Sequence, residues 1–228
     1  MLHKETVTPG TLELIHHLMD DEKLKQFYLI GGTALSLMLG HRLSIDIDLF
    51  TLDDFNGLEL AKHLKYNHQA TILNARDNYL TGHINGVKLD MLVHSYPHIN
   101  PMRDPEGIRM LSLEDIAAMK INAIVGNGTR VKDFVDIHYL LKDMSYQQIV
   151  DAYSTKYPNT NIHQMRMSLL HHHDIDFTTE ILLIKDKFKW PVIEKSIKTA
   201  IAEHELILKK NIVDNRKRGP KKGLGRKM

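Results

Sequence analysis

The stretch FYLIGGTALSLMLGHRLSIDIDLF, residues 27–50, decides the fold of this chain. Its apolar run at residues 27–30 predicts a short strand that the pair Gly31-Gly32 ends. Residues 33–39 predict a short helix with Thr33 as its N-cap. In residues 45–50 (IDIDLF) every second residue is apolar, and this strict alternation is typical of a strand with one buried face. The stretch therefore predicts the first part of a mixed α/β unit.

Two carboxylates lie on the predicted strand at residues 45–50. Side chains alternate along a strand, so Ile45, Ile47 and Leu49 should point into a core while Asp46 and Asp48 share the other face. Their Cα atoms would be roughly 6–7 Å apart, and two unit charges at that spacing repel by about 2–3 kcal/mol at an effective dielectric constant near 20. A solvated strand end is the ordinary interpretation of such a pair. A buried pair needs a cation or a shared proton, and Mg²⁺ suits an all-oxygen site.

A third carboxylate and a glycine turn strengthen the metal interpretation. In residues 87–94 one face is apolar, and Asp90 shares the opposite face with Lys88. If this strand lies beside residues 45–50, three aspartates converge, and they could hold two Mg²⁺ ions for an in-line phosphoryl or nucleotidyl displacement. The Gly31-Gly32 turn could bind a phosphate at the start of the following helix, because backbone N–H groups and the helix dipole favour anions there.

The remaining pattern divides the chain into two parts and a tail. Before residue 105 we expect helices at 11–20 and 55–66 and strands at 70–75, 79–85 and 87–94, with a hairpin turn at Asn85-Gly86. Residues 96–107 contain three prolines and predict a linker. Helices are expected at 113–125, 131–141, 146–157, 161–170 and 190–210. The predicted fold class is α+β: a mixed-sheet α/β domain at 1–105, a helical domain at 106–210 and a basic flexible tail at 211–228.

Composition excludes several classes of protein. The chain has 228 residues and no cysteine, which excludes disulfide scaffolds, thiol catalysis and iron–sulfur clusters. No apolar run is long enough to span a membrane, residues 1–10 lack the apolar core expected of a signal peptide, and a cytoplasmic location is expected. The net charge of +2 is unevenly placed, because residues 209–228 hold nine Lys/Arg and one Asp. Such a tail is either a solvated end or an electrostatic arm for a phosphate backbone.

Three segments carry a resemblance to a known family. Residues 28–35 (YLIGGTAL) with 40–50 (GHRLSIDIDLF) resemble the first motif of the AbiEii/AbiGii nucleotidyltransferases, toxin-like members of the polymerase-β superfamily. Residues 113–120 (LEDIAAMK) are similar to the family's D-x₄-K motif, and residues 132–137 (KDFVDI) to its last motif. Thr33 stands where the superfamily usually has serine, with the hydroxyl retained. The resemblance implies a mixed-sheet nucleotidyltransferase core, an NTP substrate with Mg²⁺, transfer of a nucleoside monophosphate to RNA such as tRNA, and often a cognate antitoxin.

The resemblance also implies roles for individual residues. The metal ligands would be Asp46, Asp48 and Asp90. The nucleotide would be bound by Gly31, Gly32, Thr33, Arg42, Ser44 and Lys120. An acceptor-side carboxylate, which could take a proton from the attacking hydroxyl, would be Asp133 or Asp136.

Each of these side chains also has an ordinary structural interpretation. Lys120 lies in an apolar helix stripe and could snorkel to solvent. Arg42 could be a surface arginine, and Lys132 with Asp136 could be a helical i,i+4 ion pair. The sequence favours a Mg²⁺-dependent nucleotidyltransferase that is the toxin of a toxin–antitoxin or abortive-infection system. The alternatives are a non-catalytic NTP- or RNA-binding protein and a metal-dependent nuclease; the glycine turn and Lys120 favour a triphosphate over the nuclease.

Overall fold

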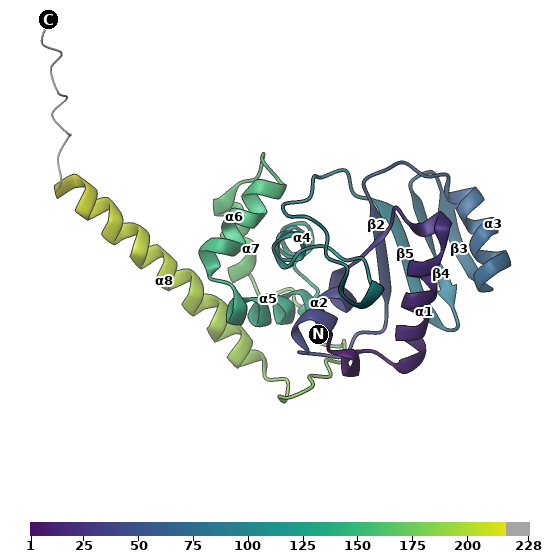
Figure 1. Ribbon diagram of the computed structural model, residues 1–228. Helices are drawn as coiled ribbons and strands as arrows, with labels where there is room; N and C mark the ends of the chain where they lie inside the picture. The colour runs from purple at the N-terminus through teal and green to yellow at the C-terminus, as the bar shows by residue number, and fades with distance from the viewer. Residues whose placement is uncertain (218–228) are drawn as a thin grey trace, which may run out of the picture.

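A five-stranded mixed sheet forms the centre of the N-terminal part in the computed structural model, which describes residues 1–217 (Figure 1). The strand order is β1-β2-β5-β4-β3. The strands are β1 Tyr28–Ile30, β2 Ile47–Thr51, β3 Thr71–Arg76, β4 Tyr79–Ile84 and β5 Val87–Val93. Strands β2 and β5 are parallel, and the other neighbours are antiparallel. The mixed sheet confirms the predicted fold class.

Strand β5 pairs with β4 through a tight hairpin and with β2 on its other edge. Asn85 and Gly86 both have positive φ, at 50° and 78°, as a tight hairpin turn requires. On its other edge β5 pairs with β2, where Asp90 is the direct neighbour of Asp48. The predicted strand pair is therefore present, with Leu49 and Met91 buried on the opposite face.

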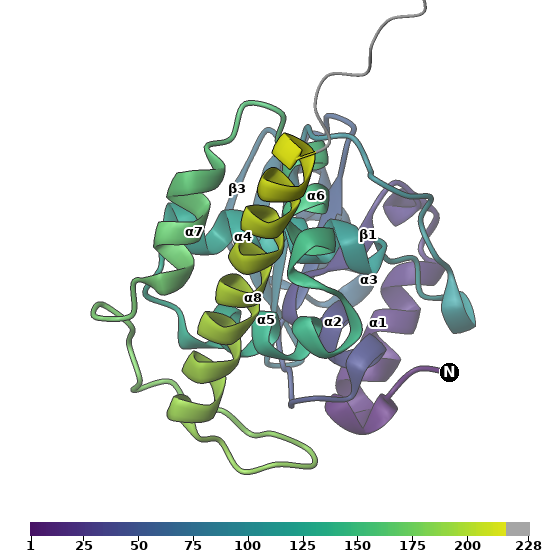
Figure 2. The ribbon, with the colours of Figure 1, turned by 90° about the vertical axis from the view of Figure 1, so that its left-hand side faces the viewer.

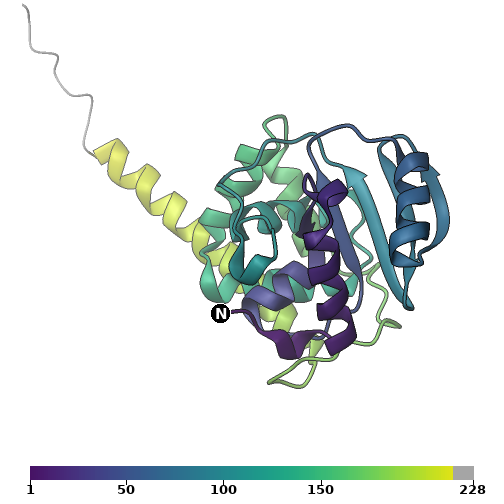
Figure 3. The ribbon, with the colours of Figure 1, turned by 45° about the vertical axis from the view of Figure 1, so that its right-hand side comes forward.

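Three helices and three short 3₁₀ turns complete the N-terminal part. The helices are α1 Pro9–Asp20, α2 Gly31–Leu39 and α3 Gly57–His68, and the turns are η1 Lys4–Thr6, η2 Glu22–Leu24 and η3 Pro105–Gly107. Helix α3 packs on β3 and β4, while α2 packs on β1 and β2. In Figures 1 and 3 the sheet stands between α3 and the C-terminal helices.

The C-terminal part is helical, as predicted. It contains α4 Leu113–Gly126, α5 Val131–Asp143, α6 Tyr146–Lys156, α7 Ile162–Leu170 and α8 Trp190–Lys217. Helix α4 packs against α5, α6 and α7 and also reaches α2. Figure 2 shows α8 crossing the outside of this group. None of the helices within residues 1–217 is long and apolar enough to cross a membrane.

Helix α8 is longer than the sequence pattern predicts. We expected it to end near residue 210, but it continues to Lys217, and its last turns extend away from the body (Figure 1). The first residues of the predicted tail, 211–217, are therefore helical. Residues 218–228 of that tail lie outside the described residues.

The proline-rich segment at 96–107 is tied to both parts of the chain. A buried Asp115 accepts hydrogen bonds from the Ile99 N–H at 3.0 Å and from the Lys156 ammonium at 2.8 Å, and Lys156 also donates to the Pro97 carbonyl. Just after this segment, the Leu29 N–H donates to the Arg109 carbonyl, so residues 109–110 add to the edge of β1. The division at residue 105 stays a prediction, but the connection across it is firmly held.

Two local predictions at the first motif are wrong. Helix α2 begins at Gly31, two residues earlier than expected, and no side chain caps it. Thr33 lies inside the first turn, where its hydroxyl donates to the Asp46 carbonyl. Strand β2 begins at Ile47, and the Ile45 side chain is exposed rather than in the core. The reason is that residues 41–46 form a loop, which the Thr33 hydroxyl holds at Asp46.

Candidate active site

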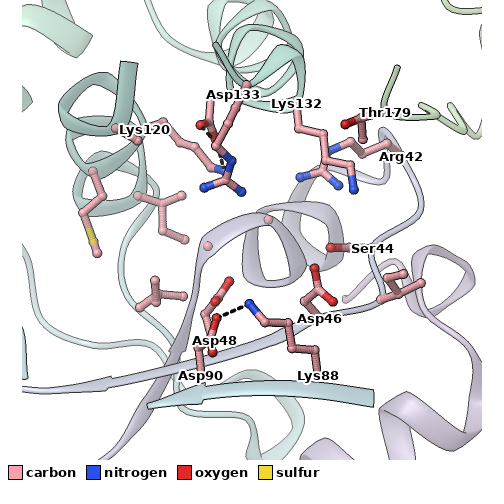
Figure 4. A pocket seen from close by; sticks show the side chains of 18 of the residues that line it. Arg42, Ser44, Asp46, Asp48, Lys88, Asp90, Lys120, Lys132, Asp133 and Thr179 are labelled. Atoms are coloured by element: carbon pink, nitrogen blue, oxygen red, sulfur yellow. Dashed lines mark hydrogen bonds and ion pairs between the residues drawn. The ribbon is translucent and has the colours of Figure 1, made fainter. Parts of the chain in front are cut away.

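A pocket of about 720 Å³ lies between the sheet and the C-terminal helices. Figure 4 shows its charged side chains in two groups. The carboxylates of Asp46, Asp48 and Asp90 lie on the strand side, and Lys120, Lys132 and Arg42 lie across the pocket from them. The pocket therefore has one acidic wall and one largely basic wall.

The three predicted aspartates do meet on the acidic wall. Asp48 and Asp90 are register partners on parallel strands, so their Cα atoms are about 4.8 Å apart. Asp46 comes from the loop that enters β2. Burial raises the pKa of Asp48 to about 6; Lys120 opposes this rise, and the nearby charges of Asp90 and Asp46 add to it.

The acidic wall fits a hard divalent cation. Its donors are all carboxylate oxygens, which Mg²⁺ and similar ions prefer. Within the described part of the chain, Asp90 is the one member of the three with a direct cationic partner: its carboxylate accepts a hydrogen bond from Thr81 and forms an ion pair with Lys88 at 2.6 Å. Burial, with the charges of Asp90 and Asp46, raises the pKa of Asp48, and a cation bound beside it would stabilise its ionised form.

Two glycines bring the start of α2 against this wall. Gly31 has a φ of +74°, and a Cβ there would lie 2.3 Å from a carboxylate oxygen of Asp48. A Cβ on Gly32 would lie 2.3 Å from the Arg42 guanidinium. Both glycines line the pocket, and the absence of a side-chain cap leaves the first N–H groups of the helix without a side-chain acceptor. A helix N-terminus of this kind can bind an anion.

Thr33 and Ser44 differ in their access to the pocket. Ser44 lines it, whereas Thr33 does not. The Thr33 hydroxyl lies 2.9 Å from the Ser44 hydroxyl and donates to the Asp46 carbonyl. Thr33 therefore fixes the loop that presents Asp46, and Ser44 is the hydroxyl that a ligand could reach.

Asp136 is a buried anchor and does not line the pocket. Its carboxylate accepts hydrogen bonds from Arg42 Nε at 2.7 Å and Nη2 at 3.0 Å, and from His41 Nε2 at 2.9 Å. Lys120 Nζ lies 2.7 Å away. Arg42 and Lys120 hold the pKa of Asp136 well below its ordinary value despite its burial. This network fastens the loop after α2 to α4 and α5.

The network changes what can be expected of Arg42 and Lys132. Arg42 is buried, so its interpretation as a surface arginine is wrong. Two of its five N–H groups donate to Asp136 and a third donates to the Leu43 carbonyl, which leaves two for a ligand. The i,i+4 pair of Lys132 with Asp136 is also wrong, because Asp136 is occupied. Lys132 lines the pocket without an ion-pair partner among the side chains of residues 1–211, and burial lowers its pKa.

Lys120 and Asp133 form the inner end of the basic wall. Lys120 Nζ lies 2.8 Å from one Asp133 oxygen, and its side chain is only 9% exposed, so it does not snorkel to solvent. The other Asp133 oxygen has no hydrogen-bond partner in the described chain, and Arg130 lies 3.7 Å from it. Asp133 lines the pocket and Asp136 does not, so geometry favours Asp133 as the acceptor-side carboxylate.

Several lining residues were not predicted as site residues. An aromatic end is formed by Phe50, His94 and Tyr157, with the His94 ring 3.1 Å from the Tyr157 hydroxyl. The coil at residues 179–182 closes another side, because the Leu43 N–H donates to the Leu182 carbonyl at 2.8 Å. Strand alternation could have found Lys88, which shares a face with Asp90. No local pattern marks the aromatic end or the coil.

The mixed sheet, the glycine-led helix and the paired aspartates define a nucleotidyltransferase. A family model described as "Nucleotidyl transferase AbiEii toxin, Type IV TA system" matches residues 13–102 and 89–171. The chain belongs to the AbiEii family. Nucleotidyltransferases of this fold generally use divalent metal ions, in agreement with the carboxylate wall.

Two similar proteins extend the comparison. An uncharacterized protein of Aquifex aeolicus (strain VF5) is 28% identical over 184 residues, which cover 78% of this chain and 87% of that protein. The crystal structure of JHP933 from Helicobacter pylori aligns over 93% of this chain and 100% of its own, with a TM-score of 0.54 and 19% identity. The second similarity supports the fold.

Proposed function

We propose that the chain transfers a nucleoside monophosphate from an NTP to an acceptor hydroxyl, using two Mg²⁺ ions. One observation carries the proposal: Asp46, Asp48 and Asp90 meet in the same pocket as the N-terminus of α2. Metal ligands and an anion-binding helix start are the two features that a metal-bound triphosphate requires. A nuclease would need the carboxylates but not the glycine-led helix.

The N–H groups of Gly31 and Gly32, with the Ser44 hydroxyl, bind the triphosphate in this proposal. Asp46, Asp48 and Asp90 hold the metal ions, which supply charge stabilisation for the phosphates when bound. Lys132 and the remaining Arg42 N–H groups face the phosphates from the opposite wall.

The reaction then needs only a proton acceptor. The acceptor oxygen attacks the α-phosphorus, its proton moves to the free oxygen of Asp133, and the bond between the α-phosphorus and the bridging oxygen breaks as pyrophosphate leaves. Lys120 holds the Asp133 carboxylate in place through the 2.8 Å ion pair. We place the nucleobase at the aromatic end, against Phe50, His94 and Tyr157.

We further propose that the acceptor is RNA, such as tRNA, and that the protein acts in the cytoplasm as a toxin with a cognate antitoxin. The family description as a type IV toxin supports the toxin role. The charge distribution supports the acceptor: residues 209–228 carry nine Lys/Arg, and the Arg130 side chain is largely exposed beside the pocket. Such charges attract a phosphate backbone.

A labelling experiment tests the proposal. The protein is incubated with each α-³²P-labelled NTP, Mg²⁺ and total RNA, and covalent label in RNA is measured. Asp48→Asn should abolish labelling, whereas Asp174→Asn, in the exposed pair Asp174-Ile175-Asp176 outside the pocket, should retain it. NTP binding without any label would indicate the non-catalytic alternative, and shortened unlabelled RNA would indicate the nuclease.

A further inference from the structure

A second cluster of metal-ligating side chains lies outside the active site. It consists of Asp21, which directly follows α1, and His63 and His68 of α3. One ligand atom from each residue lies within 4.8 Å of the others. We propose that these three side chains bind a transition-metal ion such as Zn²⁺.

The carboxylate of Asp21 is built to receive both imidazoles. Its Oδ1 accepts the backbone N–H of Lys23 at 2.9 Å as the cap of η2, which fixes the side chain. Its Oδ2 is left for the histidines: Nε2 of His63 lies 2.6 Å from it and Nε2 of His68 lies 2.7 Å from it. All three side chains are between 11% and 14% exposed, so they are shielded but can be reached from solvent.

The donor set distinguishes this cluster from the active site. Two imidazole nitrogens and one carboxylate oxygen suit Zn²⁺ or Co²⁺, whereas the three aspartates of the pocket suit Mg²⁺. In a tetrahedral site with bonds of about 2.0–2.1 Å, neighbouring ligand atoms are about 3.3 Å apart. The Nε2–Oδ2 distances would therefore have to grow by about 0.6–0.7 Å, which small side-chain rotations supply. A water molecule would complete the fourth position.

A supporting side chain is already in place. The Asn67 side-chain amide lies 3.0 Å from His63 Nδ1. When Nε2 binds a metal, Nδ1 carries the proton, and the amide oxygen of Asn67 can accept it after a rotation of the amide group. Such partners orient the imidazole ligands of metal sites.

A bound ion would join two elements that are distant in the sequence. Asp21 marks the end of α1, while both histidines lie on α3, which covers β3 and β4. The proposed role is thus a structural clip that holds α3 to the α1–η2 corner. The site is independent of the proposed transfer reaction, so it can be tested without an activity assay.

Cobalt supplies the test, because tetrahedral Co²⁺ has intense visible absorption. Full-length protein, freed of metal, is titrated with CoCl₂ in excess MgCl₂, which fills the carboxylate wall. We expect one equivalent of tetrahedral Co²⁺, displaced by Zn²⁺, and a higher melting temperature with Zn²⁺ than with EDTA. His63→Gln and His68→Gln should each weaken Co²⁺ binding by at least about tenfold, because loss of a residue that only supports a metal ligand already costs about that much affinity.

A matched control separates this cluster from the other histidines. The double variant His171→Gln/His173→Gln changes two side chains of the His171–His173 tract, of which His171 is exposed, and should bind Co²⁺ like the parent. Melting in EDTA checks that each variant is folded. The proposal is overturned if the parent gives no tetrahedral spectrum, or if the His63 and His68 variants bind as the parent does while the tract variant loses the ion.

Discussion

Lys120→Met should destabilise the protein strongly, because the ammonium group lies between two buried carboxylates. Lys120 Nζ is 2.8 Å from Asp133 and 2.7 Å from Asp136, and both aspartates are at most 1% exposed. At an effective dielectric constant near 20, each attraction is worth about 6 kcal/mol. Desolvation of the three charges offsets most of this sum. Removal of one member of such a buried group typically costs about 3–5 kcal/mol, and we expect a loss in that range.

The two carboxylates should contribute unequally to this loss. Asp136 keeps Arg42 and His41 as partners after the substitution, whereas among the described residues Asp133 keeps Arg130 alone, at 3.7 Å. The buried Asp133 carboxylate, left without its ammonium partner, should therefore account for most of the lost free energy of unfolding. Adding Asp133→Asn to Lys120→Met should then recover about 1–2 kcal/mol, a coupling typical of residues in direct contact.

Urea unfolding at pH 7 measures the free energy of unfolding of the parent and of both variants. Lys198→Met is the control, because Lys198 pairs with Glu194 at 2.5 Å on an exposed helix face and should contribute less than about 1 kcal/mol. The penalty of Lys120→Met should shrink as pH falls below about 3.9, the unfolded pKa of an aspartate. Asp136, whose pKa its cationic partners hold well below that value in the fold, then loses the stabilisation that these partners give it. A loss below about 1 kcal/mol at pH 7, or no recovery in the double variant, would contradict this account of Lys120.

The acidic wall could be predicted from the sequence because its information is local. Strand alternation fixes the face of Asp48 and of Asp90, and the Asn85-Gly86 turn fixes the hairpin of β4 and β5. The parallel pairing of β5 with β2, which brings the two aspartates together, could only be assumed. Glycines at the start of α2 were also evident, although the helix begins earlier than expected. The strand faces, the hairpin turn and the glycines depend on backbone geometry within a few residues, whereas the pairing of β2 with β5 does not.

The basic wall could not be predicted, because its partners are chosen by long-range packing. Arg42 and Asp136 are separated by 94 positions, and nothing in either segment indicates that they pair. Local reasoning instead paired Lys132 with Asp136, which the packing of α5 against the loop after α2 excludes. The coil at 179–182 is likewise part of the pocket only because it pairs with residues 41–43, without a periodic pattern of its own.

Gly31, Asp48 and His94 each line the pocket, and substitution of each has a measurable consequence. Gly31→Ala should abolish NTP binding in calorimetric titration and cost about 1–3 kcal/mol, because a Cβ would meet Asp48 at 2.3 Å and φ is +74°. Asp48→Asn should raise the melting temperature of the metal-free protein at pH 8 but not at pH 4. The pKa of Asp48 is about 6 in the fold and about 3.9 in the unfolded chain, so this carboxyl destabilises the fold only above about pH 3.9. His94 gives the opposite dependence. Burial, with a contribution from Lys156, lowers its pKa to about 4, so below pH 6.5 the unfolded chain binds a proton that the folded state excludes. Stability should therefore fall as pH drops from 6.5 to 4, by up to about 3 kcal/mol from this residue, and urea unfolding at pH 4.5 and 7.5 should show a smaller difference for His94→Gln than for the parent. The control variant His171→Gln, at an exposed position, should show the same difference in unfolding free energy between the two pH values as the parent. If His94→Gln also shows the parent's difference, burial at the aromatic end of the pocket does not hold His94 neutral.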